Sequence, residues 1–144
     1  MIVPDINLLV YAYNADAPYH AAAKQWWERV LSEDEPVGLP WAVILGFIRL
    51  MTHPRVVVDP LAPAEVLAVV RSWVERPSVQ LLEPGPRHLT LMEKLLVEAG
   101  VAGSLTTDAH IAALAIEYRC TVCTTDTDFA RYSGVRIQDP IRAA

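Results

Sequence analysis

The sequence is poor in cysteine, in early basic residues and in long hydrophobic runs, and each shortage excludes a class of protein. Two cysteines are too few for a disulfide framework, so nothing indicates an oxidising compartment. The longest apolar run, Trp41 to Ile48, is far shorter than the roughly 18 residues of a membrane-spanning helix. The first basic residue is Lys24, so the beginning of the chain lacks the charged region of a signal peptide. We therefore expect a cytoplasmic protein with no membrane association.

Acidic residues outnumber basic ones, and no flexible linker interrupts the sequence. The chain has 12 Lys and Arg against 17 Asp and Glu, a net charge of −5, which argues against binding to nucleic acid through a general basic surface. A local basic patch stays possible. No repeat, low-complexity tract or Gly/Ser linker divides the 144 residues, and the 11 prolines fall between periodic segments. We expect one domain spanning residues 1–144.

Short apolar segments alternate with amphipathic ones along the chain. Strands are predicted at residues 1–4, 79–82, 121–124 and 135–137. Helices are predicted at residues 20–32, 40–52, 63–76, 87–98 and 108–118. Strands separated by helices of this length predict a short parallel sheet flanked by helices on both faces, which is a three-layer α/β fold.

Three aspartates are expected at one edge of that sheet. Asp5 and Asp126 each follow a predicted strand, and Asp108 stands at the start of a helix. Ligand sites in open parallel sheets lie beyond the carboxyl ends of the strands. Taken singly, each acid also has a local explanation, because Asp108 could cap its helix and Asp126 and Asp128 could form a turn.

Gathered together, these acids would repel one another unless a cation lay among them. The only two lysines, Lys24 and Lys94, fall in the middle of predicted helices, away from the strand ends. Carboxylate and water oxygens are ligands that suit Mg²⁺ or Mn²⁺. The pattern therefore favours a divalent metal.

Four motifs occur in order along the chain: Val3-Pro4-Asp5-Ile6-Asn7, Trp41 through Gly46-Phe47-Ile48-Arg49, Thr107-Asp108-Ala109-His110-Ile111-Ala112-Ala113, and Thr124-Thr125-Asp126-Thr127-Asp128-Phe129. With these motifs the sequence resembles a PIN-domain ribonuclease. More narrowly it resembles the VapC-type toxins of bacterial toxin–antitoxin pairs, in particular a group abundant in mycobacteria. The resemblance runs from Ile2 to Pro140.

This resemblance implies a PIN-like fold and a Mg²⁺-dependent endoribonuclease, a hydrolase that cleaves RNA phosphodiester bonds with a metal-activated water. Mn²⁺ should also support activity. It implies that Asp5, Asp108 and Asp126 are the catalytic metal ligands, that Asp128 is a secondary ligand, and that Thr124 orients Asp5. It also implies a homodimer and a cognate VapB-type antitoxin, for which the aromatic residues Tyr11, Tyr13, Trp26 and Trp27 are our candidate contacts.

One position departs from the family pattern. Most members have a glutamate just before the Phe-x-Arg pattern, where this chain has Gly46, and no acid occurs between Glu35 and Asp59. We expect solvent to fill the gap at Gly46 and the second metal position to be weakened. Gly46→Glu should then lower the metal concentration needed for cleavage and slightly stabilise the helix.

Two other functions are compatible with parts of the sequence. A haloacid-dehalogenase-type phosphatase would use Asp126 as nucleophile and Asp128 as acid/base, although Ala130 occupies the position of an expected threonine. A non-catalytic PIN-like binding module would explain Gly46.

Three further groups have a structural and a functional interpretation. Cys120 and Cys123 have metal or redox spacing, but they fall in a predicted strand, which favours the core. His110 could line the acidic edge or cover the helix start. Trp26 and Trp27 are neighbours on a helix, so one can be buried while the other is partly exposed, either at the edge of the core or on a partner-binding surface.

Overall fold

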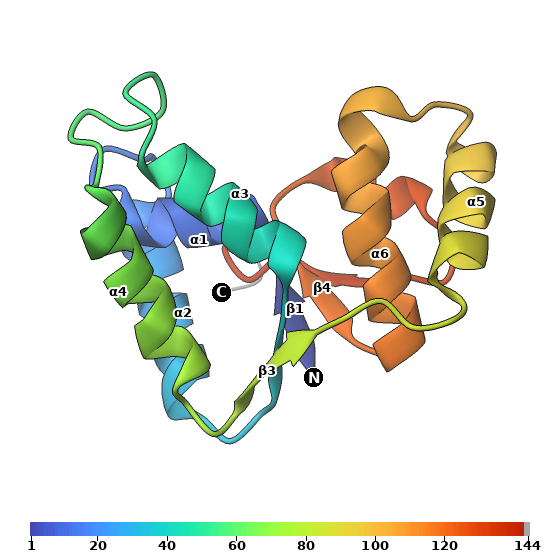
Figure 1. The fold of residues 1–144 in the computed structure, drawn as a ribbon, viewed down its shortest axis with the longest axis horizontal. Coiled ribbons are helices and arrows are strands. Elements are labelled where there is room, and N and C mark those ends of the chain that lie inside the picture. The colour runs from blue at the N-terminus through green and yellow to red at the C-terminus, as the bar shows by residue number, and fades with distance from the viewer. Residues whose placement is uncertain (143–144) are drawn as a thin grey trace.

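A computed structural model describes residues 1–142, and its centre is a five-stranded parallel sheet in the order β3-β2-β1-β4-β5. The strands are β1 (Ile2–Pro4), β2 (Val37–Pro40), β3 (Val79–Leu82), β4 (Thr121–Cys123) and β5 (Arg136–Gln138). The α-helices are α1 (Ile6–Tyr13), α2 (His20–Ser32), α3 (Trp41–Met51), α4 (Pro63–Val74), α5 (His88–Ala99) and α6 (Thr106–Tyr118). Helices α1 to α4 gather on one side of the strands, with α5 and α6 on the other (Figure 1). The predicted α/β fold is confirmed.

The strand register places the ends of β1 and β4 side by side. Pro4 pairs with Cys123 in the parallel ladder, so the next residues of the two strands, Asp5 and Thr124, emerge together at the carboxyl edge. The backbone N–H of Asp5 donates to the carbonyl of Cys123 at 2.9 Å, which continues the ladder by one more bond. This edge is where the sequence predicted the acids to meet.

Helix α1 and strand β2 were missed by the sequence analysis, and the starts of α3, α5 and α6 differ from the predicted ones by one or two residues. Helix α1 is apolar on most of its surface, which hides the helical period, and β2 contains Gly38 and Pro40, residues that are rare in strands. Pro40 ends β2 and precedes α3, so it is not in the first turn of that helix as expected. Helix α6 begins at Thr106, which makes Asp108 the third helical residue.

An aromatic cluster joins the four helices on one side of the sheet. The ring of Trp73 on α4 packs against Phe47 at 4.6 Å, against Trp27 at 5.5 Å and against Tyr13 at 5.7 Å between centroids. The indole N–H of Trp73 also donates to the hydroxyl of Tyr13 at 2.9 Å. Each of the four helices contributes one ring to the cluster, so the contacts of Trp73 hold α1, α2 and α3 against α4.

The burial of this region corrects one expectation about the tryptophans. Trp26 and Trp27 are 6% and 1% exposed, so both belong to the core, and the expectation that one would be partly exposed is wrong.

Cys120 and Cys123 are reduced and buried, which agrees with their predicted place in the core. Burial raises the pKa of the Cys123 thiol to about 12. The thiol is therefore protonated at neutral pH, whereas metal ligation and nucleophilic attack both require a thiolate. None of the helices in residues 1–142 is both long and apolar enough to cross a membrane.

Trp73→Ala should lower the free energy of unfolding by about 3–5 kcal/mol, because it removes a fully buried ring that three other aromatic rings contact. Urea denaturation followed by circular dichroism measures this loss. Leu89→Ala is the control, since Leu89, on α5, is 80% exposed and should change stability by less than about 0.5 kcal/mol. Equal losses in the two variants would contradict the central role of the cluster.

Candidate active site

Asp5 is the buried centre of the acidic edge. It follows β1 directly and caps α1, where its carboxylate accepts the N–H of Ile6 at 2.7 Å. The hydroxyl of Thr124 donates to the other carboxylate oxygen at 2.8 Å. Burial, which leaves Asp5 only 4% exposed, raises its pKa; the two hydrogen bonds oppose this rise, and the charge of Asp126 adds to it.

Thr124 links Asp5 to the next acid of the cluster. Its hydroxyl accepts the backbone N–H of Asp126 at 2.9 Å while it donates to Asp5, so the donor and acceptor directions are both fixed. Thr124 is itself only 1% exposed. The hydrogen bond to Asp5 is the contact expected of a hydroxyl that orients this carboxylate. The part that Thr124 plays in a reaction stays a prediction.

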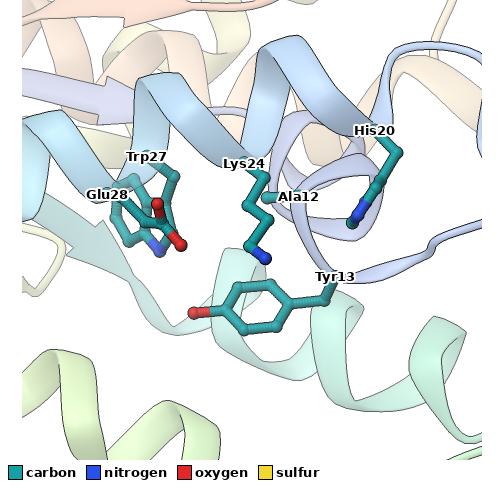
Figure 2. A pocket seen from close by; sticks show the side chains of 6 residues that line it. All are labelled: Ala12, Tyr13, His20, Lys24, Trp27 and Glu28. Atoms are coloured by element: carbon teal, nitrogen blue, oxygen red, sulfur yellow. The ribbon is translucent and has the colours of Figure 1, made fainter.

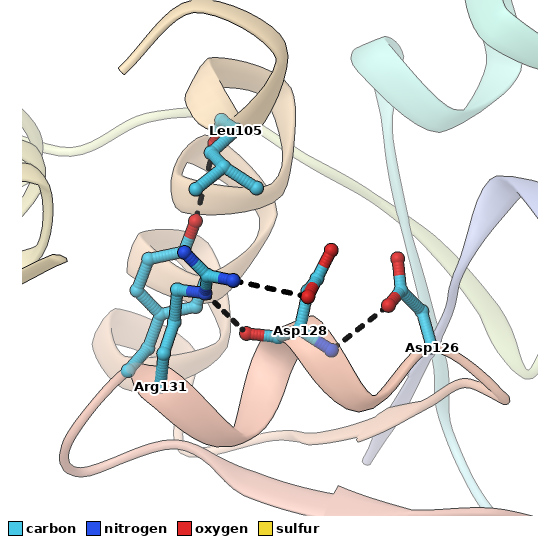
Figure 3. A network of polar contacts seen from close by, with 5 residues as sticks. Leu105, Asp126, Asp128 and Arg131 are labelled. Atoms are coloured by element: carbon cyan, nitrogen blue, oxygen red, sulfur yellow. Dashed lines mark hydrogen bonds and ion pairs between the residues drawn. The ribbon is translucent and has the colours of Figure 1, made fainter. Parts of the chain in front are cut away.

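Asp126 and Asp128 form the turn that follows β4. Asp126 caps the short 3₁₀ helix Thr127–Arg131 by accepting the N–H of Asp128 at 2.8 Å. Arg131 folds back on this turn and donates to the Asp128 carboxylate at 3.0 Å and to its carbonyl at 3.2 Å (Figure 3). The turn-forming interpretation is therefore correct, and the turn also holds both carboxylates at the acidic edge.

Asp108 completes the cluster from the first turn of α6. Burial first, and then the charges of Asp5, Asp126 and Asp128, raise the pKa of Asp108 to about 7, with Arg131 opposing the rise. No hydrogen bond in the described part of the chain reaches its carboxylate, and the helix starts two residues earlier, so the capping interpretation is wrong. All four predicted acids thus influence one another electrostatically.

The acids share an edge but are not arranged as a finished metal site. Among residues 1–142, no three His, Cys, Asp or Glu side chains already have the spacing of metal ligands. Asp5, Asp126 and Asp128 each hold an N–H or O–H donor of the protein itself. The described structure therefore shows a concentrated negative charge that only Arg131 opposes directly.

Comparison with known proteins identifies the family of the domain that carries these acids. Residues 2–135 match the model of the PIN domain. The chain is 43% identical to ribonuclease VapC33 of Mycobacterium tuberculosis, over 99% of both chains. This chain belongs to the VapC ribonucleases of the PIN-domain family.

Solved structures agree with the family at the level of the fold. VapC20 of Mycobacterium tuberculosis, described as a sarcin-ricin loop cleaving toxin, superposes with a TM-score of 0.69 at 19% identity and covers 94% of this chain and 99% of that one. VapBC2 of Rickettsia felis, solved bound to a fragment of promoter DNA, gives 0.69 at 16% identity, with 96% and 98% covered. Membership of the PIN family removes the support for the phosphatase alternative.

In this PIN domain, the packing of α3 against α1 explains why position 46 is a glycine. A Cβ atom at position 46 would lie 2.6 Å from Cδ1, 3.1 Å from Cγ1 and 3.2 Å from Cγ2 of Ile6, the residue after Asp5. The expectation that solvent fills this position is wrong, because the Ile6 side chain fills it. The same contact argues against the expected stabilisation by Gly46→Glu, since a larger side chain must displace Ile6.

The sequence analysis also missed a pair of histidines. Nε2 of His88 on α5 lies 2.8 Å from Nδ1 of His110 on α6, with the rings edge to face. Burial, and then His88, lowers the pKa of His110. They are 22 positions apart in the sequence, and this spacing gives no signal of a pair. Because His110 packs against α5, its structural interpretation is favoured over a place in the acidic cluster.

Gly46→Ala should lower the free energy of unfolding by about 1–3 kcal/mol, because its Cβ overpacks the contact between α1 and α3. In an Ile6→Ala background the three contacting atoms are gone, and Gly46→Ala should become neutral or stabilising. Urea unfolding of the four proteins in this double-mutant cycle measures the coupling. A stabilising Gly46→Ala in the wild-type background would contradict the packing explanation. The lower metal requirement of Gly46→Glu stays a prediction, best tested with Ile6→Ala.

Asp108 should make the metal-free protein less stable as the pH rises. Its pKa is about 7 in the folded state against 3.8 in the reference state, so the folded chain binds the extra proton between these values. That stabilisation is complete below about pH 4 and is lost as the pH passes 7. At about 1.4 kcal/mol per pKa unit the whole shift corresponds to about 4 kcal/mol, and solvent screening reduces this because Asp108 is only half-buried. Asp108→Asn should therefore raise stability in EDTA at pH 8 by about 1–3 kcal/mol, and much less at pH 5.

Asp59→Asn is the control for this experiment, because it removes one exposed negative charge far along the chain from the cluster. Urea unfolding at both pH values compares the two variants with the wild type. If Asp59→Asn gives the same gain at pH 8, net charge rather than the acidic cluster explains the effect.

Proposed function

We propose that this PIN domain is the toxin of a toxin–antitoxin pair, and that it cleaves RNA as a divalent-metal-dependent endoribonuclease. The observation that carries the proposal is the gathering of four carboxylates at one edge of the sheet, where hydrogen bonds run from Asp5 through Thr124 to Asp126 and Asp128. Burial, and then the charges of these three acids, raises the pKa of Asp108 beside them. Family relatives named as ribonucleases support the same activity. The proposal treats residues 1–144 as one domain.

The donor set at the acidic edge fits Mg²⁺ or Mn²⁺. Asp5, Asp108 and Asp126 would hold the ion, with Asp128 as a secondary ligand, and hard oxygen ligands of this kind suit both metals. When bound, such an ion supplies charge stabilisation at the scissile phosphate and activates water for attack. No carboxylate reaches the cluster from α3, because Gly46 stands where most relatives have glutamate, so the chain offers four acids in all.

The chain's own residues keep these acids in place. Thr124 and the N–H of Ile6 hold one oxygen of Asp5 each, which fixes the plane of the carboxylate. Each oxygen keeps a second lone pair for another partner. Arg131 neutralises part of the charge of Asp128. We assign no histidine or serine as a nucleophile.

We infer three further properties of the toxin. A VapB-type antitoxin is its partner, which agrees with the VapBC complexes among the solved structures of this fold. A homodimer is supported by exposed apolar side chains on α3 and α4, namely Trp41, Leu45 and Leu67. The cytoplasm, where cellular RNA is present, is its proposed location.

Millimolar Mn²⁺ or Mg²⁺ should raise the melting temperature of the purified protein, because an ion that binds only the folded state stabilises it, by about 2.7 kcal/mol at a hundredfold excess over Kd. Asp5→Asn and Asp108→Asn should remove most of this shift. Asp16→Asn, which removes an exposed acid between α1 and α2, should keep it. A melting temperature that ignores both ions would overturn the metal proposal.

The same proteins test catalysis. Wild type with Mn²⁺ should cut RNA internally, and Asp5→Asn should reduce the rate by at least about a hundredfold, since a preorganised charge interaction at the reacting phosphate is lost. A well-folded wild type that binds the metal but leaves all RNA intact would favour the non-catalytic binding module instead. Expression in a bacterium, scored for growth arrest, provides an independent readout.

A further inference from the structure

Within the described residues, Arg131 is the cation that acts on the acidic cluster. Its Nη2 donates to the Asp128 carboxylate at 3.0 Å (Figure 3), and its charge also opposes the rise in the pKa of Asp108. The two lysines lie elsewhere. Lys94 is on α5, and Lys24 lines a pocket beside α1 and α2 that none of the four acids lines (Figure 2). Arg131 is therefore the basic group that an RNA strand would meet beside the acids.

The backbone that carries Arg131 is anchored, whereas its side chain is free to turn. Phe129 and Tyr132, on either side of it, are 0% and 2% exposed. The hydroxyl of Tyr132 donates at 3.2 Å to the carbonyl of Leu105, the residue before α6, and ties the segment to that helix. The Arg131 side chain is 38% exposed, and an ion pair at such exposure contributes little to stability. The guanidinium can therefore leave its partner while the segment stays in place.

The guanidinium of Arg131 has donors to spare. Its contacts with Asp128 use one N–H of Nε and one of Nη2, and Nη1 makes no hydrogen bond within residues 1–142. The planar fork of an arginine matches the oxygens of a phosphate and binds them in pairs. The four acids of the cluster only accept hydrogen bonds when ionised, and so do the phosphates of RNA. Arg131 therefore supplies both the charge and the donors that the acids lack.

Asp128 has two competing partners. Its Oδ1 accepts from Arg131 in this structure, and the same carboxylate is the proposed secondary ligand of the divalent ion. Two cations that share one carboxylate repel each other, so the ion pair with Arg131 is weaker when the metal site is loaded. Loading the site thus favours a guanidinium that is free of Asp128, at the edge of the sheet where the scissile phosphate must approach.

We propose that Arg131 is a substrate-binding residue of this site, which pairs with Asp128 in the metal-free protein and turns to an RNA phosphate when the site holds a divalent ion. This inference rests on the ribonuclease function proposed above. It gives the loss of Arg131 two effects of opposite sign, because one positive charge disfavours the metal and favours the RNA. A residue that only supports the turn would change stability and would not separate the two affinities in this way.

Calorimetric titration of Mn²⁺ into the full-length protein without RNA tests the first effect. Arg131→Gln should bind Mn²⁺ about threefold or more tightly than the wild type does, because a positive charge beside the ligands is gone, and salt should reduce the difference. Arg29→Gln is the matched control, since Arg29 pairs with Glu33 in another exposed ion pair, on α2. It should leave the Mn²⁺ affinity unchanged. An Arg131→Gln variant with unchanged or weaker Mn²⁺ binding would overturn the proposal.

Cleavage of a labelled RNA that the wild type cuts, at an Mn²⁺ concentration that saturates each protein, tests the second effect. Arg131→Gln should lower kcat/KM about tenfold or more, mainly through a higher KM, because a charge-assisted hydrogen bond to phosphate is lost. Arg131→Lys should recover part of the loss, since it keeps the charge without the fork. Guanidinium ions should also speed cleavage by Arg131→Ala, whereas sodium ions at the same concentration should not.

The outcomes separate this inference from the proposed function. A wild type that neither binds Mn²⁺ nor cuts RNA would overturn the proposed function and the role of Arg131 with it. A wild type that does both, beside an Arg131→Gln variant that matches Arg29→Gln in both assays, would overturn the role of Arg131 alone. Tighter Mn²⁺ binding with an unchanged kcat/KM would make Arg131 a counter-charge without a phosphate contact, and that result would also overturn the proposal.

Discussion

The hydrogen bond from Thr124 to Asp5 joins two points of the chain that are 119 residues apart, and the acidic cluster depends on it. The bond exists because β1 and β4 are neighbours in the sheet and their register ends both strands at the same level. From Thr124 the network continues to the backbone of Asp126 and then to Asp128. Three acids are thus held by one parallel strand pair, and only Asp108 comes from a different element.

Close packing behind this edge fixes the direction in which α1 leaves the sheet. Ile6 fills the space above Gly46, and the Trp73 cluster holds the opposite end of α1 through Tyr13. The carboxylate of Asp5 therefore stands at the start of a helix that is held at both ends. The same packing puts an apolar contact with Ile6 at position 46, so α3 adds no carboxylate to the acidic edge.

Much of the fold followed from local patterns. Helix α2 has the predicted bounds, His20–Ser32. Gly100 ends α5 in the left-handed conformation with φ of 74°, a residue type and conformation common at helix ends. Elements whose composition is ambiguous were missed or misplaced. Helix α1 is apolar on nearly all sides and β2 contains glycine and proline, so both are specified by their neighbours in the core more than by their own residues.

By itself the sequence determined the residue types and their order: the aspartates after strands, the helix periods, the net charge and the family motifs. The tertiary structure alone decided which side chains meet. It joined His88 to His110 and Ile6 to Gly46. It also raised the pKa of Asp108, first by burial and then by three carboxylates that are distant in sequence. Periodicity along the chain encodes which face of a helix or strand is buried. The contacts between side chains depend instead on how closely elements that are far apart in sequence approach one another, and the packing of the whole core sets this spacing.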